Sequence, residues 1–450
     1  MKILSAVLIL IMLLTSHGAV ESQECPINID EALTEAAGCA SIGANEVCFG
    51  HTPVESLVNC ELAPNFAAPG DVLPLESMCT LRTGAMQSTG EWGLAVMRVL
   101  PHAAAQPITI VLVGEAELYD AASGLQALDA HIDTDVSVLS GPASTFAEIG
   151  RLTAGQVVHV NACNCTGNWL RTVLEDGRVG WIASSYVTTL GEASSLPVVS
   201  VDTPVYESMQ AFTLRSGSAE RACAEVPEDG ILIQVPSGAD PVPIQINGVP
   251  ILLGGTAFVQ SQLGTPQTIE VLAGFANVTG VDFVASVTAG MRAVILMSDS
   301  DTVSGAVQVE PFSPTDVEAL PITLLPEPVD VMAVFEQNTP QIVGHELCRV
   351  VSNVGGTVCP LYFADRDGDA ISRMDVEFVS APMGDWTGSI LENPVIIAGD
   401  TMSGALAWNV TCSLGTANFI GPIIWSITLT DAAGNVSQPF EASFYCIDGP

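Results

Sequence analysis

A short stretch in the middle of the chain, residues 136–187, constrains the fold more than any other part of the sequence. It carries a tryptophan, an Asp-Gly turn, a Gly-Trp step and a closing Ser-Tyr pair, in that order. Asp-Gly between apolar segments is a strong signal for a tight turn between two strands. The stretch therefore predicts short strands joined by turns. The residues are Gly167-Asn168-Trp169-Leu170, Asp176-Gly177-Arg178-Val179-Gly180-Trp181-Ile182 and Ser185-Tyr186.

This order of motifs resembles that of bacterial SH3 (SH3b) domains, which are small exported β-barrels that mostly bind cell-wall polymers or proteins. Two further segments agree with the family: residues 136–142 match its first strand and loop, and residues 149–155 match the turn before its next strand. Leu139 stands where the family usually has an arginine, so a contact made by that arginine is not expected here. The resemblance implies an SH3-like barrel over residues 131–190.

Four side chains of this stretch are candidates for binding a ligand: Trp169, Tyr186, Phe146 and Asp176. Aromatic side chains on a small barrel offer flat apolar faces to sugar rings or peptide stems, and an acid such as Asp176 can pair with an amine. Large aromatic residues also fill the interior of small barrels. We expect Trp181 to lie in the core, and Trp169, which follows a loop, to reach the rim.

The first 22 residues have the organisation of a signal peptide. Lys2 precedes the apolar run 3–14, and small and polar residues follow. The run is shorter than the roughly 20 apolar residues that a transmembrane helix needs. No L-x-x-C lipobox precedes Cys25, and no later apolar segment is long enough to span a bilayer. The sequence therefore predicts a secreted or cell-surface protein without a transmembrane segment.

All 12 cysteines lie after the predicted signal peptide, and an even number in an exported chain favours disulfide bonds. The formal net charge is −38, and the only lysine is Lys2. A chain this acidic repels phosphate backbones, so we expect no nucleic-acid partner. The absence of lysine after the signal peptide excludes a P-loop and a Schiff-base lysine.

The whole sequence predicts a mainly β, multi-domain protein. Hydrophobic residues make up 48% and charged residues 14% of the chain, with glycine and proline between short apolar segments. Residues 229–309 resemble FecR-type β-domains. Residues 340–446, with Trp425 as expected core, resemble bacterial Ig-like domains. The predicted parts are a signal peptide (1–22), a small disulfide-rich α+β domain (23–120), the SH3-like barrel (131–190), a β-rich FecR-like domain (207–310), a Pro-rich linker (311–339) and an Ig-like β-sandwich (340–450).

The loop Asp365-Arg366-Asp367-Gly368-Asp369 is the best candidate metal site. Carboxylates at alternate positions, in Asp365, Asp367 and Asp369, place hard oxygen atoms on one side of a loop, as Ca²⁺ prefers. The glutamate that an EF-hand has later in its loop is absent here. The alternative interpretation is a simple hydrophilic turn, and the protein would then have no cofactor. The motif at His345-Glu346 lacks the second histidine of a zinc protease, and no G-x-S-x-G occurs.

These observations favour a non-catalytic binding protein of bacterial type, whose barrel recognises cell-wall glycan, peptide or a surface protein. Two alternatives stay open. The first is a cell-wall hydrolase with catalysis in the N-terminal domain. The second is a sensory or interaction module in the envelope. The hydrolase would use residues among Asp71, Glu76, Glu91 and His51, whose spacing matches no known catalytic motif.

Overall fold

In the computed structural model the chain is mostly β, with 53% of residues in strands and 9% in helices, which confirms the predicted fold class. The predicted signal peptide lies outside the described residues. Within them, no helix is long and apolar enough to cross a membrane. The structure describes residues 29–447 except 59, 88–90, 103, 123–126, 165, 202, 218–225, 280–282, 298–302, 334–338, 347–348, 352–356, 366, 381–388, 402, 411–412, 415–416 and 419–420.

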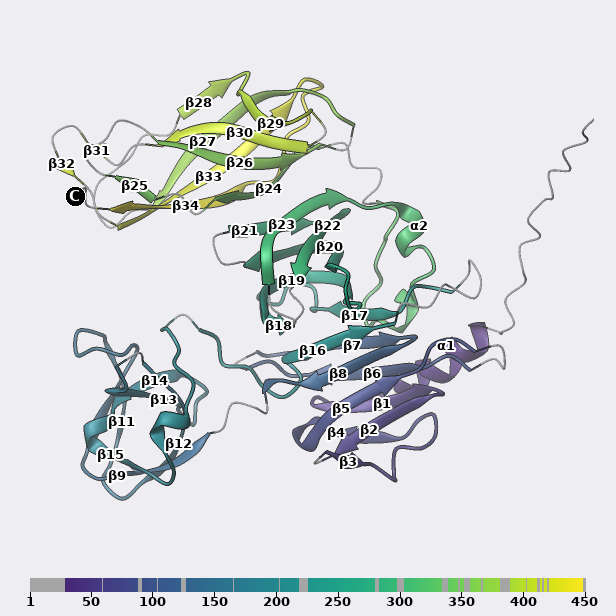
Figure 1. Cartoon of the computed structure of the whole chain (residues 1–450), viewed down its shortest axis with the longest axis vertical. Helices are drawn as coiled ribbons and strands as arrows, with labels where there is room; N and C mark the ends of the chain where they lie inside the picture. Colours follow the sequence, from purple (N-terminus) through teal and green to yellow (C-terminus); the bar gives the residue numbers. More distant parts are fainter. Residues whose placement is uncertain are drawn as a thin grey trace, which may run out of the picture.

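The largest unit, called the body below, is built from two parts of the chain that flank the barrel in sequence (Figure 1). Its first part contains α1 (Ile29–Ala37), η1 (Gly38–Ser41), β1 (Glu46–His51), β2 (Val54–Val58), β3 (Glu61–Leu62), β4 (Val72–Pro74), η2 (Leu75–Ser77), β5 (Met78–Thr83), β6 (Leu94–Val99), β7 (Ile108–Val113) and β8 (Ala116–Asp120). Its second part contains β16 (Ala211–Ser216), β17 (Gly230–Gln234), β18 (Val242–Ile246), β19 (Val249–Gln260), β20 (Gln267–Thr279), β21 (Phe283–Thr288), β22 (Met291–Met297), β23 (Val303–Pro311), α2 (Pro314–Val317) and η6 (Ile322–Leu324).

The two parts of the body share one sheet. Antiparallel pairing joins β7 to β17 over residues 109–113 and 230–234, and joins β8 to β16 over 116–120 and 212–216. Both β7 and β17 are buried along their whole length, because one hydrophobic cluster covers each face of the sheet. The predicted boundary between residues 23–120 and 207–310 is therefore not a boundary between two cores. The sequence could not show this, because an apolar run indicates that a strand is buried but does not indicate which distant strand pairs with it.

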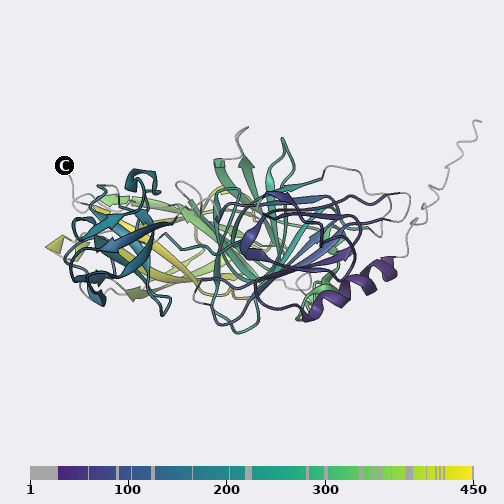
Figure 2. The ribbon, with the colours of Figure 1, turned by 90° about the horizontal axis from the view of Figure 1, so that it is seen from below.

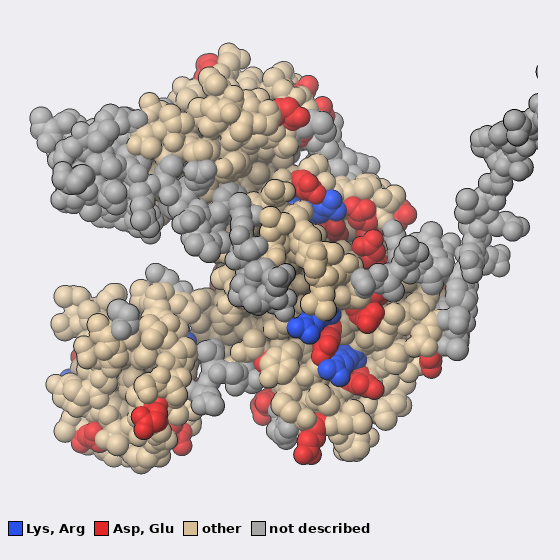
Figure 3. Space-filling model, viewed as in Figure 1, with Lys and Arg blue, Asp and Glu red and all other residues tan. Residues whose placement is uncertain are grey.

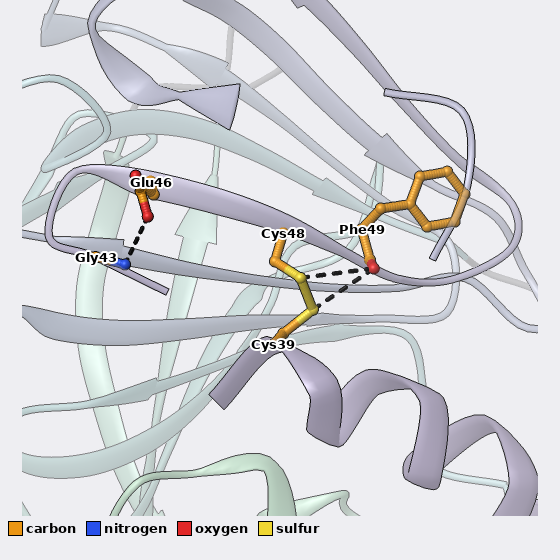
Figure 4. Close-up of a disulfide and its surroundings, with 5 residues drawn as sticks. All are labelled: Cys39, Gly43, Glu46, Cys48 and Phe49. Atoms are coloured by element: carbon orange, nitrogen blue, oxygen red, sulfur yellow. Dashed lines mark hydrogen bonds between the residues drawn. A yellow bond between two sulfur atoms is a disulfide. The ribbon is translucent and has the colours of Figure 1, made fainter. Parts of the chain in front are cut away.

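Helix α1 lies on the outer face of this sheet and buries Ala32 and Ala36 there. A disulfide between Cys39, just after the helix, and Cys48 in β1 fixes its end to the sheet (Figure 4). A second disulfide joins Cys60 to Cys79. The prediction of a disulfide-rich α+β segment at this end of the chain is confirmed.

Residues 311–339, predicted as a Pro-rich linker, instead pack on the body as far as the structure describes them. Helix α2 begins with a capping box in which Ser313 and Asp316 bond each other's backbone. The η6 segment that follows lies beside α1 on the same face of the sheet (Figure 2). Prolines interrupt this segment, but its apolar residues pack on the sheet of the body. The segment therefore forms part of the core. Those buried residues are Phe312, Val317, Leu320, Leu324, Leu325 and Val331.

The barrel is an insertion between two neighbouring strands of the body. Ala121, just after β8, donates a hydrogen bond to the carbonyl of Ala211, the first residue of β16, at 3.0 Å. The barrel strands are β9 (Leu128–Ile132), β10 (Val136–Leu139), β11 (Glu148–Leu152), β12 (Val157–Cys163), β13 (Trp169–Val173), β14 (Val179–Ala183) and β15 (Val187–Thr189), with η4 (Ser184–Tyr186) between the last two.

One histidine connects the barrel to the body. His102, between β6 and β7, lies with Nδ1 2.9 Å from Glu207 Oε1 and with Nε2 2.8 Å from the carbonyl oxygen of Gly177, in the tight turn of the barrel. The hydrogen bond to Glu207 raises the pKa of His102, against the opposing effects of burial and of Arg171. The same hydrogen bond lowers the pKa of Glu207. Both shifts favour a charged histidine that donates from both ring nitrogens.

The remaining strands form a two-layered sandwich around Trp425, Trp408 and Phe444, and burial of Trp425 is as predicted. Pairing of β24 with β21 continues the sheet of the body into the sandwich. One layer contains β24 (Gln341–Glu346), β26 (Thr357–Ala364), β29 (Ile396–Gly399) and β30 (Ser403–Val410). The other contains β25 (Arg349–Val351), β27 (Ile371–Ser380), β28 (Ser389–Glu392), β33 (Gly421–Asp431) and β34 (Phe440–Ile447), and β31 (Ser413–Leu414) and β32 (Ala417–Asn418) form a separate hairpin.

Leu320→Ala tests whether residues 311–339 belong to the core. Because Leu320 is buried against the body, its truncation should lower the free energy of unfolding by about 3 kcal/mol. Thermal or urea unfolding measures this loss. Met332→Ala, at an exposed position of the same segment, is the control and should change stability little. Equal small effects of both substitutions would mean that the segment is a spacer.

The His102 contact should make the docking of the barrel depend on pH. The contribution of protonated His102 is complete below the ordinary histidine pKa of about 6.5 and is lost as pH rises through its raised pKa. We expect the free energy of docking to weaken by about 1 kcal/mol, a small amount because the partner Glu207 is half-exposed. Small-angle scattering should show a larger maximum dimension at about pH 9 than at about pH 6.

His102→Gln provides the matched control, because glutamine keeps a donor for Gly177 but does not titrate in this range. The pH dependence of the maximum dimension should disappear in this variant, while His131 and His159 remain. An unchanged profile would assign the effect to other histidines.

Candidate ligand-binding surface of the barrel

The barrel is one sheet in which β13 and β14 pair along their whole length, from Trp169 opposite Ala183 to Val173 opposite Val179. The connection between these strands is the tight turn that contains Asp176 and Gly177. This hairpin places the predicted site residues at different ends. Strand register, rather than distance in the sequence, therefore decides which of them lie together.

Trp181 is buried, as expected, although the interior cluster of the barrel contains its neighbour Ile182 instead. Trp181 is 1% exposed and pairs with Leu139 of β10. The preceding Gly180 faces the other side of the strand, where a Cβ atom would collide with the side chain of Val138. The Gly-Trp step of the sequence thus has a packing cause. Trp181 is not available to a ligand.

Trp169 and Tyr186 lie at one end of the hairpin. Trp169 is half-buried at the start of β13, where its N–H donates to Asn164 Oδ1 at 3.1 Å. Ser184, which begins η4, donates to the carbonyl of Asn168 at 2.9 Å, so η4 starts beside Trp169. Tyr186 closes η4 and is 46% exposed. This end of the barrel therefore presents one partly covered and one exposed aromatic ring, called the aromatic edge below.

Asp176 does not lie at the aromatic edge. The five residues of β13 separate the two ends of the hairpin, a distance of about 13 Å along an extended strand. The Asp176 carboxylate is also engaged, because Arg178 donates to it at 2.8 and 2.6 Å. These bonds lower the pKa of Asp176. Asp176 therefore lies apart from Trp169, because the Asp-Gly turn closes the opposite end of the hairpin. That Asp176 pairs with an amine of a ligand stays a prediction.

Phe146 is 39% exposed in the loop between β10 and β11, where its ring lies over Gly141. In the described part of the chain no ring contact joins Phe146 to Trp169 or Tyr186. We therefore keep Phe146 outside the aromatic edge.

An acid that the sequence pattern did not single out lies near Tyr186. The N–H of Asp133 donates to the carbonyl of Tyr186 at 2.9 Å, and its carboxylate accepts from the hydroxyl of Thr188 at 3.0 Å. Asp133 is exposed and lies in the connection between β9 and β10. The pairing of β9 with β15 places this connection beside Tyr186. The sequence does not indicate this proximity, because Asp133 and Tyr186 are far apart in the chain.

The predicted metal loop is placed only in part as expected. Carboxylate oxygens of Asp365 and Asp367 lie within 4.8 Å of each other and of Asp431, whereas Asp369 is not in this group. Asp431 ends β33, opposite Ile371 at the start of β27. Burial, followed by the neighbouring Asp367, raises the pKa of Asp365. Asp431 was missed because it belongs to a separate hairpin of the sequence.

Two residues named for the hydrolase alternative have structural contacts. The Asp71 carboxylate accepts from the N–H groups of Ala67 and Ala68, both at 2.9 Å, which lowers the pKa of Asp71. His51 Nδ1 lies 2.8 Å from the carbonyl of Trp92. Of the other two, Glu76 is exposed in η2, and Glu91 lies in the connection before β6.

The comparison with protein families matches residues 134–188 to the model of the bacterial SH3 domain. The match covers strands β10 to β14 and the first residues of β15, and it does not include β9. No curated protein matches the chain. The strands, the buried Trp181 and the position of the match agree, and residues 134–188 are thus a bacterial SH3 domain, a type of domain that commonly binds other molecules.

Proposed function

We propose that this protein is a secreted or cell-surface binding protein that recognises bacterial cell-wall glycan or its peptide stems through the aromatic edge of its SH3 domain. The body and the sandwich act as a rigid support for that domain. The sequence pattern of a signal peptide supports export, and the disulfides Cys39–Cys48 and Cys60–Cys79 suit an oxidising compartment.

The observation that carries the proposal is the different exposure of the barrel aromatics. Trp181 is buried, while Tyr186 is exposed and Trp169 is partly exposed at one end. The rings of tryptophan and tyrosine stack on the apolar faces of sugars and cover alkyl stems at a low cost in conformational entropy. Residues of this kind provide most of the binding energy in small interfaces.

The charge of the chain indicates which ligands fit. The barrel and the body both carry acidic side chains, and the basic side chains visible on the body lie next to acidic ones (Figure 3). Asp133 adds an exposed carboxylate beside the aromatic edge. A neutral glycan or an amine-bearing peptide suits this surface, and a polyanion does not.

The proposal describes binding without catalysis. The contacts of Asp71 and His51 in the N-terminal part support this, because the carboxylate caps a turn and one ring nitrogen is taken up by a backbone carbonyl. Turbidity measurements on purified cell walls test it directly, and lysis by the parent protein would favour the hydrolase alternative.

Substitutions at the aromatic edge should weaken binding to purified peptidoglycan. Removal of a ring that contacts the ligand costs about 2 kcal/mol, so Trp169→Ala and Tyr186→Ala should each raise the dissociation constant about 30-fold. Sedimentation with peptidoglycan over a range of protein concentrations measures this change.

Two controls separate the aromatic edge from general effects. Tyr119→Ala removes an exposed ring from β8 of the body, and Asp176→Asn changes the far end of the barrel hairpin. Both variants should bind like the parent. Loss of binding with Asp176→Asn but not with Trp169→Ala would move the site to the turn, and absence of binding by the folded parent would reject a cell-wall ligand.

A further inference from the structure

Three aspartates meet at one end of the sandwich, two from one loop and one from the end of a strand. Asp365 follows β26, Asp367 lies two residues further in the same loop, and Asp431 ends β33. Strand β26 belongs to one layer, while β27 and β33 belong to the other. The loop between Ala364 and Ile371 therefore passes from one layer to the other at this point.

The Asp365 carboxylate is the unusual member of this group. Asp365 is 1% exposed, and within the described residues neither of its oxygens has a hydrogen-bond partner of normal geometry, since among hydrogen-bonding groups only the acidic residue Asp367 approaches this carboxylate. A carboxylate without a donor is expensive to bury, and Asp367 and Asp431 place further negative charge beside it. The basic residue at the start of β27, Arg373, is engaged by Asp375 at 2.6 Å and does not compensate this charge.

Asp431, in contrast, has a fixed orientation. Its carboxylate accepts from the backbone N–H of Asn435 at 2.8 Å and from the Asn435 side-chain amide at 2.7 Å. The Asp367 carboxylate accepts from the N–H of Asp369 at 3.3 Å. Two of the three acids are thus positioned by neighbouring backbone, and each carboxylate keeps lone pairs for another partner.

The spacing of the oxygens suits a large divalent cation. Ca²⁺ binds oxygen atoms at about 2.3–2.6 Å, so two ligands of one ion lie at most about 5 Å apart. One oxygen from each of the three aspartates meets this limit, since all lie within 4.8 Å of one another. Mg²⁺, with bonds of about 2.0–2.1 Å, requires ligands within about 4.2 Å of one another and holds its waters more firmly.

We propose that Asp365, Asp367 and Asp431 bind one Ca²⁺ ion that joins the two layers of the sandwich. The ion supplies the partner that the buried Asp365 carboxylate lacks, and water or loop carbonyls complete its coordination. It fixes the loop after β26 to the end of β33. The sandwich is therefore a calcium-stabilised unit, and its ligand set differs from the predicted one by the exchange of Asp369 for Asp431.

The experiment uses the full chain, freed of divalent ions by a chelator and then titrated with CaCl₂ or MgCl₂ at constant ionic strength. Constant ionic strength is essential, because a chain with a net charge of −38 attracts any cation. Thermal unfolding should shift to higher temperature as Ca²⁺ increases, and less with Mg²⁺. Isothermal titration calorimetry should give one site.

Asp365→Asn and Asp369→Asn form a matched pair, because each removes one charge from the same loop. Asp365→Asn should weaken Ca²⁺ binding at least about tenfold, since affinity depends on the number of charged ligands. Without calcium it should be as stable as the parent or more stable, because it removes an unpaired buried charge. Asp369→Asn should keep the affinity of the parent.

This combination separates a binding role from a structural one. A structural aspartate would lower stability without calcium when replaced, and it would leave the shift caused by calcium intact. No shift in the parent, or the same loss of affinity in both variants, would overturn the proposal.

Discussion

The structure depends on hydrogen bonding between two distant parts of the chain. β7 and β8, before the barrel, pair with β17 and β16, after it. Because β7 and β17 are buried on both faces, these pairs hold together the two hydrophobic clusters of the body. The barrel, the packed segment 311–333 and the continuation into the sandwich through β24 all attach to this sheet.

The aromatic residues of the SH3 domain differ in exposure. Trp181 is buried, whereas Trp169 is partly exposed and Tyr186 is exposed at the edge, where we propose that they bind a ligand. The opposite end of the same hairpin faces the body through Gly177 and His102. The proposed recognition site and the contact with the body are thus located at two ends of one pair of strands.

The sequence was sufficient where structure is local. The Asp-Gly and Gly-Trp steps located the barrel, and the size of Trp181 indicated that this residue is buried. Contacts between distant segments could not be predicted from the sequence. Strand register separates Asp176 from Trp169, and Asp431 lies near Asp365 only because β33 pairs with β27. The prolines of residues 311–339 indicated an extended linker. The sequence could not correct this, because the surface that the leucines of the segment cover is formed by other parts of the chain.

The hydrogen bond between Ala121 and Ala211 has a consequence for how such chains change. The polypeptide departs from the sheet and returns to it at adjacent positions, so a loop of a few residues could replace everything between them. Modules whose termini lie close together are tolerated as replacements at such points. A scaffold of this kind can exchange its recognition module, and with it the target, while its own strand pairing stays the same.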